Sequence, residues 1–557
     1  MNKRAWIALS IILLGATCLR FFSLDKQGIQ GMDEGRYLLD GLSKLNEIEF
    51  YRGLVEGKVN EIRGKETFSL PEFLRREHDI LGKLPPFSPK LGFDYVTALY
   101  MAVAGYSVDA CNYIEAASGV VMIALLFALV RALAGARAAL VAAAALAISP
   151  YHVYFSRNAY PQCLSALLLI LAVLAHLGWT VAREKENRDR YGLLLFSGVC
   201  AGVTFWLHYQ VAGALPLLAV LHLATTARDG RMREKLTRFA LGGCCIAGGF
   251  AAVLIAAECL SYPGILLFRS QGMLYPHGTF FELLWPRFTG QSSVPFHASG
   301  VVLFPYFFCL FEGWPAAIAW SALLLLGATL SRCSSAKKTL TALLYLGIAF
   351  LVPWLFFSVK TTQGARMFLY ALPFFAGLLG LAVDALWSNP TRHARALRVL
   401  VACLLAVGFV SSSMQLPEVL RTRSAMPEAL AFVRASDDPR ACAEWYAVLD
   451  AYLIQESMSG GNVYTYLARQ EPVPKYFLND WSGLYFSRYP DEPVALPAGS
   501  EPVKVFRHDF GRIFLETEAF PSLGDPLKNI AWTRALDLDR ARQLLVYDYA
   551  ACTANVR

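Results

Sequence analysis

Charged residues are scarce in this chain of 557 residues: Asp, Glu, Lys and Arg together make up 17% of it, whereas 56% of the residues are hydrophobic. An average soluble domain carries about 25% charged residues. A single water-exposed globule cannot hide this much apolar surface, so the composition excludes an ordinary soluble protein and indicates a membrane protein.

Apolar runs recur along the first 415 residues, and each is about 17 to 25 residues long, the length that a helix needs to cross roughly 30 Å of hydrocarbon. We therefore predict eleven spans, at residues 5–24, 112–134, 138–155, 163–182, 191–207, 211–227, 239–258, 313–331, 339–357, 366–386 and 397–414.

The first run lacks a small-x-small cleavage site before Asp25, so it is not a typical secretion signal. The sequence around Cys18 also fits a lipoprotein cleavage box poorly, because Thr17 precedes it and Arg20 follows. We expect a retained first span.

Basic residues gather in the short connections on the side of the N-terminus, at 183–190, 228–238, 331–338 and 389–398. The positive-inside rule makes that side the cytoplasm, and the net charge of +8 thus reports membrane topology, not nucleic-acid binding. We expect a multi-pass protein of the inner (cytoplasmic) membrane whose long segments face outward.

The predicted fold is an all-α polytopic membrane domain, residues 1–414, with outer loops at 25–111 and 259–312. A small extracytoplasmic α/β domain, residues 415–557, follows; there "MPEALAFVRAS" is helix-like, and "PVKVFRHDF" and "RQLLVYDYA" are strand-like. Residues 91–106 are apolar but short and contain Asp94, which favours a helix lying along the interface. Of 12 cysteines only Cys442 and Cys552 lie in the outer domain, where a disulfide between them stays open.

The middles of the predicted spans lack charged residues, whereas transporters usually keep such residues near the bilayer midplane. This absence weighs against a lipid or polysaccharide transporter or flippase. A non-catalytic envelope-assembly subunit is the other alternative. The ionisable residues instead ring the outer rim, which suits a reaction on a lipid-linked polar group; they are Arg20, Asp33, Glu34, Glu115, His208, Glu258, Glu312, Lys360 and Arg366.

Several of these residues also have simpler explanations. Asp33 can cap the helix that begins in "GMDEGRYLLDG", and Glu34 can favour its positive end. Lys360 and Arg366 can act as interfacial anchors.

Five segments, in this order, resemble the polytopic glycosyltransferases of the GT-C fold, in particular the branch with protein O-mannosyltransferases, the lipid A aminoarabinose transferase and Rgt-type sugar transferases. The segments are "GMDEGRY", "PKLGFDYVTALYMAVAG", "SPYHVYFSRNAYPQCLSALLL", "GVTFWLHYQVAGALPLL" and "ARMFLYALPFFAGLLGLA".

The resemblance implies transfer of a sugar, with inversion, from a polyprenyl-phosphate donor to a hydroxyl of a glycolipid, glycan or protein acceptor. It implies that Asp33 is the general base or positions the acceptor, with Glu34 in the same site and Arg36 and Tyr37 bracing the loop. The donor phosphate and substrate would be held by residues among Lys90, Arg157, His208, Lys360 and Arg366.

Two positions depart from the family pattern. Gln162 stands where many members have an acid, and Glu115 stands near a common Arg, so a scheme with two acids is in doubt. We predict no cofactor. A divalent metal held by Asp33 and Glu34 with His78, His277 or His297 stays an alternative, since carboxylate and imidazole suit several ions.

Overall fold

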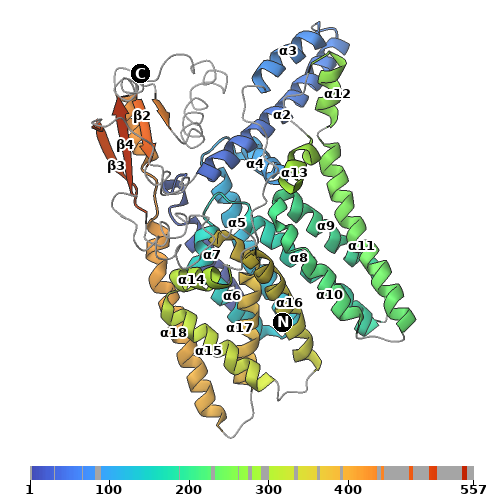
Figure 1. Ribbon diagram of the computed structural model, residues 1–557, viewed down its shortest axis with the longest axis vertical. Coiled ribbons are helices and arrows are strands. Elements are labelled where there is room, and N and C mark those ends of the chain that lie inside the picture. The colour runs from blue at the N-terminus through green and yellow to red at the C-terminus, as the bar shows by residue number, and fades with distance from the viewer. Residues whose placement is uncertain are drawn as a thin grey trace.

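The computed structural model describes residues 3–29, 32–65, 67–81, 90–186, 189–227, 232–260, 262–273, 279–289, 300–331, 337–359, 364–388, 393–435, 441–443, 476–480, 501–510 and 542–548. The mostly helical membrane fold predicted from the sequence is confirmed (Figure 1).

Each of the eleven predicted spans coincides with helical structure. The helices are α1 (Lys3–Phe21), α5 (Ala110–Leu133), α6 (Ala136–Ile148), α7 (Pro150–Phe155), α8 (Gln162–Glu186), α9 (Tyr191–Leu207), α10 (Pro216–Thr226), α11 (Met232–Cys259), α15 (Trp314–Ser331), α16 (Lys337–Val359), α17 (Leu372–Trp387) and α18 (Ala394–Arg421). Three short 3-10 helices accompany them: η1 (Leu24–Lys26), η2 (Tyr209–Gly213) and η3 (Ala365–Tyr370).

Among the described residues, seven helices are long and apolar enough to cross a membrane. An eighth crossing arises if α15 and the preceding α14 (Gly300–Glu312), bent by 117° at their junction, form one span. At the predicted spans 138–155, 191–207 and 366–386, helices α6, α9 and α17 are shorter, at 10–17 residues. The number eleven therefore stays a prediction.

The two predicted outer loops fold largely as helices at one end of the bundle, which we call the site end. These helices are α2 (Met32–Ile62), α3 (Leu70–Leu81), α4 (Leu91–Ala104), α12 (Tyr262–Ser270) and α13 (Phe280–Thr289). In Figure 1, α2, α3 and α12 form an arm at the top of the view, with α4 and α13 below it.

Helix α4 presents different residues to the protein and to its surroundings. Phe93 and Asp94 are buried, whereas Leu99 is 58% exposed and Val103 is 91% exposed. A short helix with one bare apolar face is what the interfacial location predicted for residues 91–106 requires.

Helices α9 and α11 approach each other closely because both carry glycines at the contact. A Cβ added at Gly198 of α9 would lie 2.0 Å from the carbonyl oxygen of Ile246, and one added at Gly249 of α11 would lie 2.2 Å from that of Leu195. Small residues let backbones meet in this way in membrane bundles, where van der Waals packing drives association.

We expect Gly198→Val to lower the stability of the bundle by about 1–3 kcal/mol, because the added methyl groups force the two backbones apart. Gly243→Ala is the matched control: it also changes a glycine in this helix pair, on α11, but nothing lies within 4 Å of its added Cβ. The midpoint of thermal unfolding in detergent measures both, and equal midpoints would contradict the proposed contact.

The C-terminal part contains the helix and both strands expected in its quoted motifs. They are α19 (Met426–Arg434), β3 (Lys504–Arg507) and β4 (Gln543–Asp548), joined by β1 (Ala441–Ala443) and β2 (Tyr476–Asp480). The sheet order is β1-β2-β4-β3, with β1 parallel to β2 and the other pairs antiparallel. Cys552 lies outside the described residues, so its pairing with Cys442 stays a prediction.

Backbone contacts join this C-terminal part to the site end. The Ser424 amide donates to the Gln27 carbonyl at 3.0 Å, just before α2 begins. The Ala425 amide donates to Nδ1 of His508 at 2.9 Å. The segment after α18 is thus fixed beside the start of α2.

Candidate active site

The adjacent acids at the start of α2 were predicted to lie at the centre of the site. Asp33 belongs to the first turn of α2, but its side chain lies outside the described residues. Glu34 is buried at 1% exposure, and its Oε1 accepts a hydrogen bond of 3.1 Å from the Ala159 amide. This bond ties α2 to the turn between α7 and α8, which is distant in sequence.

Lys90 and Tyr37 form the first contact between predicted site residues. Lys90 precedes α4, and its Nζ lies 4.1 Å from the centroid of the Tyr37 ring. The ammonium also donates to the Tyr37 hydroxyl. An ammonium over an aromatic face is stabilised by the ring quadrupole, so Tyr37 holds the cation in a fixed place.

A second cation, Arg366, lies over the ring of Tyr160, which neighbours Tyr37. Tyr160 packs edge-on against Tyr37 with centroids 6.3 Å apart, and the guanidinium carbon of Arg366 lies 4.7 Å from the Tyr160 centroid. Four side chains from α2, α4, the α7–α8 turn and η3 thus form one row, which we call the two-cation ring pair: Lys90, Tyr37, Tyr160 and Arg366.

His208 is linked to this row through η3. Its Nδ1 lies 2.7 Å from the hydroxyl of Tyr370, which is four residues after Arg366. His208 is fully buried, and its ring stacks on that of Tyr370. The structure therefore brings His208 to the same segment as Arg366.

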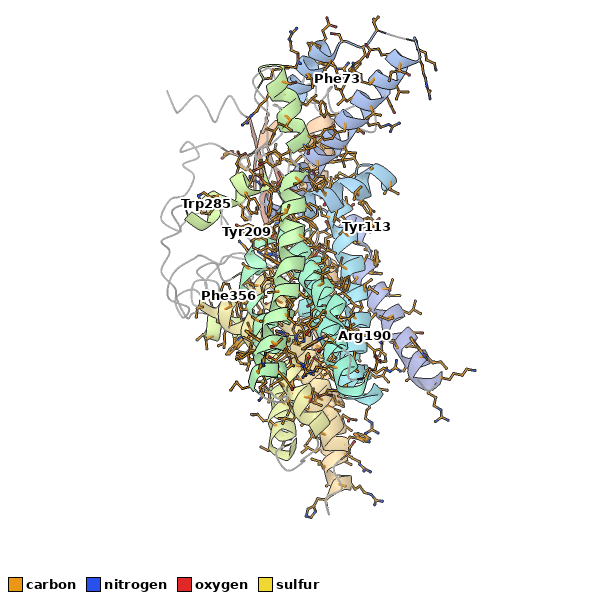
Figure 2. The ribbon with its side chains drawn as sticks, turned by 90° about the vertical axis from the view of Figure 1, so that its right-hand side faces the viewer. Phe73, Tyr113, Arg190, Tyr209, Trp285 and Phe356 are labelled. Carbon is orange, nitrogen blue, oxygen red and sulfur yellow. The ribbon has the colours of Figure 1, made fainter. Side chains whose placement is uncertain are left out.

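The site end and the basic connections lie at opposite ends of the molecule. Figure 2 shows Tyr209, next to His208, well above Arg190, which belongs to the basic connection 183–190. The arm residue Phe73 lies higher still.

Charged residues between α2 and α4, apart from Arg36, were not predicted to belong to the site. Arg36 Nε lies 3.9 Å from Oδ2 of the buried Asp40, and Lys44 Nζ lies 2.6 Å from Oε2 of Glu47. Asp94 is fully buried, and burial followed by the charge of Asp40 raises the pKa of Asp94 well above its usual range. The spacing of three or four residues from Arg36 to Glu47 was the available signal, because it places these charges on one helix face.

Comparisons with known proteins found a matching family model and similar solved structures. A family model described as "Dolichyl-phosphate-mannose-protein mannosyltransferase" matches residues 88–255. No curated protein matches the chain.

Two solved structures of ArnT from Cupriavidus metallidurans are similar over 86% of this chain and 94% of theirs. The form bound to undecaprenyl phosphate is 15% identical with a TM-score of 0.51, and the apo form is 14% identical with a TM-score of 0.52. The chain has the GT-C fold. The archaeal oligosaccharyltransferase AglB from Archaeoglobus fulgidus, in complex with an inhibitory peptide and a dolichol-phosphate, is 11% identical, with 86% and 70% coverage and a TM-score of 0.50.

Within this GT-C fold, Arg157 has a different environment from the one predicted. Its Nη1 donates to the carbonyls of Leu19, Arg20 and Phe22 at 3.2, 3.1 and 2.9 Å. Those carbonyls end α1, where cationic donors stabilise the helix terminus. Arg157 thus holds the end of α1 through Nη1, and its place among the candidates for the donor phosphate stays a prediction.

Glu115, one of the two departures from the family pattern, caps α8. Its carboxylate accepts from the amides of Cys163 and Leu164 at 2.7 and 3.3 Å. The N-terminus of α8 leaves amide groups without intrahelical partners, and the carboxylate satisfies two of them. Glu115 thus orients the turn that carries Tyr160 and Gln162.

The remaining predicted residues cannot be placed. Lys360, His277 and His297 lie outside the described residues, and His78 lies in α3 with its side chain outside them. Within the described part of the chain, no group of three or more His, Cys, Asp and Glu side chains is arranged to hold a metal ion.

Two histidines inside the bundle were overlooked in the sequence. His176 Nδ1 lies 3.0 Å from the Tyr345 hydroxyl, and His222 Nε2 lies 3.3 Å from the Phe239 carbonyl. Both are buried, with ring centroids 5.6 Å apart. Their hydrogen bonds to α16 and α11 show a packing role for one nitrogen of each ring.

Asp109, which precedes α5, should make the stability of the protein depend on pH. Burial and then the charge of Asp25 raise the pKa of Asp109 to about 7. Because the folded state holds this proton more tightly than the unfolded state, the contribution of Asp109 to stability is greatest below about pH 4 and falls as the pH rises to about 7, by up to about 4 kcal/mol.

Asp109→Asn should remove this part of the pH dependence, and Asp25→Asn should move the fall to lower pH. Thermal unfolding midpoints between pH 4 and pH 8 measure the effect. An unchanged pH slope in Asp109→Asn would contradict the assignment.

Proposed function

We propose that this protein is a membrane glycosyltransferase that moves a sugar from a polyprenyl-phosphate donor to an acceptor hydroxyl at the outer face of the cytoplasmic membrane. The GT-C fold and the family match over 88–255 support a membrane glycosyltransferase with a lipid-linked donor. The two relatives whose structures hold undecaprenyl phosphate or a dolichol-phosphate support the donor class.

The observation that carries the proposal is the two-cation ring pair. Lys90 and Arg366 come from segments more than 270 positions apart in the sequence, yet they stand on two rings that touch each other. Two cations brought together suit an anion, and a phosphate oxygen accepts charge-assisted hydrogen bonds from both types of side chain. We assign the donor phosphate to this place.

Asp33 is the proposed general base. It takes the proton from the acceptor hydroxyl as the new bond forms between that oxygen and the anomeric carbon, while the bond from this carbon to the phosphate oxygen breaks. The two electrons of the broken bond leave with the phosphate, whose added charge Lys90 and Arg366 stabilise. Attack opposite the leaving group inverts the anomeric configuration.

Glu34 supports the base instead of replacing it. Its carboxylate is buried and accepts from the Ala159 amide, so it fixes the first turn of α2 against the Tyr160 turn. This one hydrogen bond therefore holds the start of α2, which carries the base, against the turn whose Tyr160 ring contacts the Arg366 cation.

The outward orientation follows from the distribution of basic residues. The connections rich in Lys and Arg are predicted to be cytoplasmic, and Arg190 lies well below Tyr209 in the view of Figure 2. A site at the other end opens away from the cytoplasm, where nucleotide sugars are absent.

Donor turnover by the purified chain tests the proposal. The wild-type protein in nanodiscs, given decaprenyl phosphate linked to radiolabelled mannose, glucose or galactose and an extract of envelope lipids, glycans and proteins, should consume at least one donor and label an acceptor. If no donor is consumed while the protein remains folded, the proposed activity is wrong. A transporter would give no new covalent product in this assay but would move label across the membrane when reconstituted in vesicles, and an assembly subunit would do neither.

A further inference from the structure

Gln162 is a buried amide without a partner. It is the first residue of α8 and is fully buried. Neither its Oε1 nor its Nε2 has a hydrogen-bond partner within the described part of the chain. Buried polar groups are nearly always paired, because an unpaired one loses its hydration without compensation. No group in the described part of the chain therefore satisfies this amide, and its oxygen and N–H groups can bind a ligand.

Its neighbours in the sequence include residues of the proposed site and residues that contact it. Two positions earlier, the Tyr160 ring lies against the Arg366 guanidinium and packs against the Tyr37 ring. One turn later, Ser165 hydrogen-bonds Tyr370, whose hydroxyl also meets His208. In the sequence, Gln162 thus lies between a residue of the two-cation ring pair and a residue that contacts the His208–Tyr370 pair.

The local charge at this turn is already compensated. Glu115 accepts from the first two free amides of α8, at Cys163 and Leu164, so they are not available to an anion. What remains at the turn is a neutral group with one acceptor oxygen and two N–H donors. Adjacent hydroxyl groups of a sugar donate and accept at once, and so match both ends of such an amide.

We propose that Gln162 binds hydroxyl groups on the sugar of the lipid-linked donor and selects a neutral, hydroxyl-bearing sugar. This inference rests on the proposed function. The phosphate lies at Lys90 and Arg366, the sugar ring extends from it past Tyr160, and the Gln162 amide hydrogen-bonds a hydroxyl of that ring. A site built to bond a hydroxyl discriminates strongly against analogues that lack it.

The test combines variants with modified donors. Wild type, Gln162→Met and Gln162→Glu are assayed with the best of the three decaprenyl-phosphate hexoses, with each of its monodeoxy analogues, and with the corresponding amino sugar. Gln162→Met keeps the length of the side chain and removes its hydrogen bonds. Gln271→Glu, a change of the same type at an exposed position on the arm, is the control and should match wild type.

In wild type, one monodeoxy donor should lose about 100-fold or more in kcat/KM. Gln162→Met should lower kcat/KM for the parent donor by about 10- to 100-fold. For that same deoxy donor, the substitution should cause no further loss of kcat/KM. Gln162→Glu should raise kcat/KM for the amino-sugar donor relative to kcat/KM for the parent donor, because a carboxylate pairs with an ammonium.

Equal losses for all donors in Gln162→Met would overturn the inference and leave a packing role. If Gln162→Met does not fold, the wild-type series still decides, since similar kcat/KM for every deoxy donor also overturns it. Absence of any donor turnover by wild type would instead overturn the proposed function itself.

Discussion

Lys90→Ala should reduce kcat/KM for the lipid-linked donor by about 100-fold or more, because it removes a cation that stabilises the charge on the departing phosphate. The ammonium is held over Tyr37 by its ring contact and its hydrogen bond to the hydroxyl, so no other side chain on α4 replaces it. Steady-state kinetics with a decaprenyl-phosphate hexose measure the loss. Since the charge develops in the transition state, kcat should fall along with kcat/KM.

Arg52→Ala is the matched control, since it removes a cation of α2 that is 76% exposed and pairs only at the surface with Glu56. That variant should keep wild-type kinetics. Lys90→Ala within threefold of wild type would show that the phosphate binds elsewhere. Arg366→Ala should give a similar loss, and the double variant should lose less than the product of the two, because both cations act on one phosphate.

Asp33→Asn should lower the rate of sugar transfer by a factor of about 100 to 10,000, because the amide cannot accept the proton of the acceptor hydroxyl. The variant should still bind decaprenyl phosphate with wild-type affinity, because Lys90 and Arg366 are unchanged. Transfer kinetics and the affinity for the lipid are measured on the same preparation.

Glu34→Gln is the comparison for Asp33→Asn. Its Oε1 can still accept from the Ala159 amide, so the contact between α2 and the Tyr160 turn remains. Its loss should be at least tenfold smaller than that of Asp33→Asn. Turnover like wild type in Asp33→Asn would show that Asp33 is not the base.

Local patterns in the sequence were sufficient for the helices of the predicted spans, but not for α3, α12, α13 and α14, which lie in the two predicted outer loops. Length and hydropathy predicted each helical span, and periodicity predicted α19, β3 and β4, since these properties belong to short stretches of chain. The bend of 117° between α14 and α15 was not predicted. It depends on Gly313, whose φ of 81° is readable only in the structure.

The candidate site was only partly predictable because its contacts are long-range. The order of motifs singled out Lys90, Tyr37 and Arg366, but nothing local showed that Tyr160 would join them. Arg157 illustrates the converse, since an arginine at a span end has the same local sequence whether it binds phosphate or caps α1.

Asp94 and Gln162 were hidden for another reason. Their significance lies in burial without a hydrogen-bond partner among the described residues, which no periodicity reports. Asp94 was taken only as a sign of an interfacial helix, and Gln162 only as a missing acid. Their environments required the packing of α4 against α2 and of α8 against η3.

The most direct measurement is a structure of the wild-type protein in nanodiscs with decaprenyl phosphate bound. The account predicts phosphate density within hydrogen-bond distance of Lys90 Nζ and the Arg366 guanidinium, beside the Tyr37 and Tyr160 rings. Phosphate density at any other place, with Lys90 and Arg366 unchanged on their rings, would contradict it.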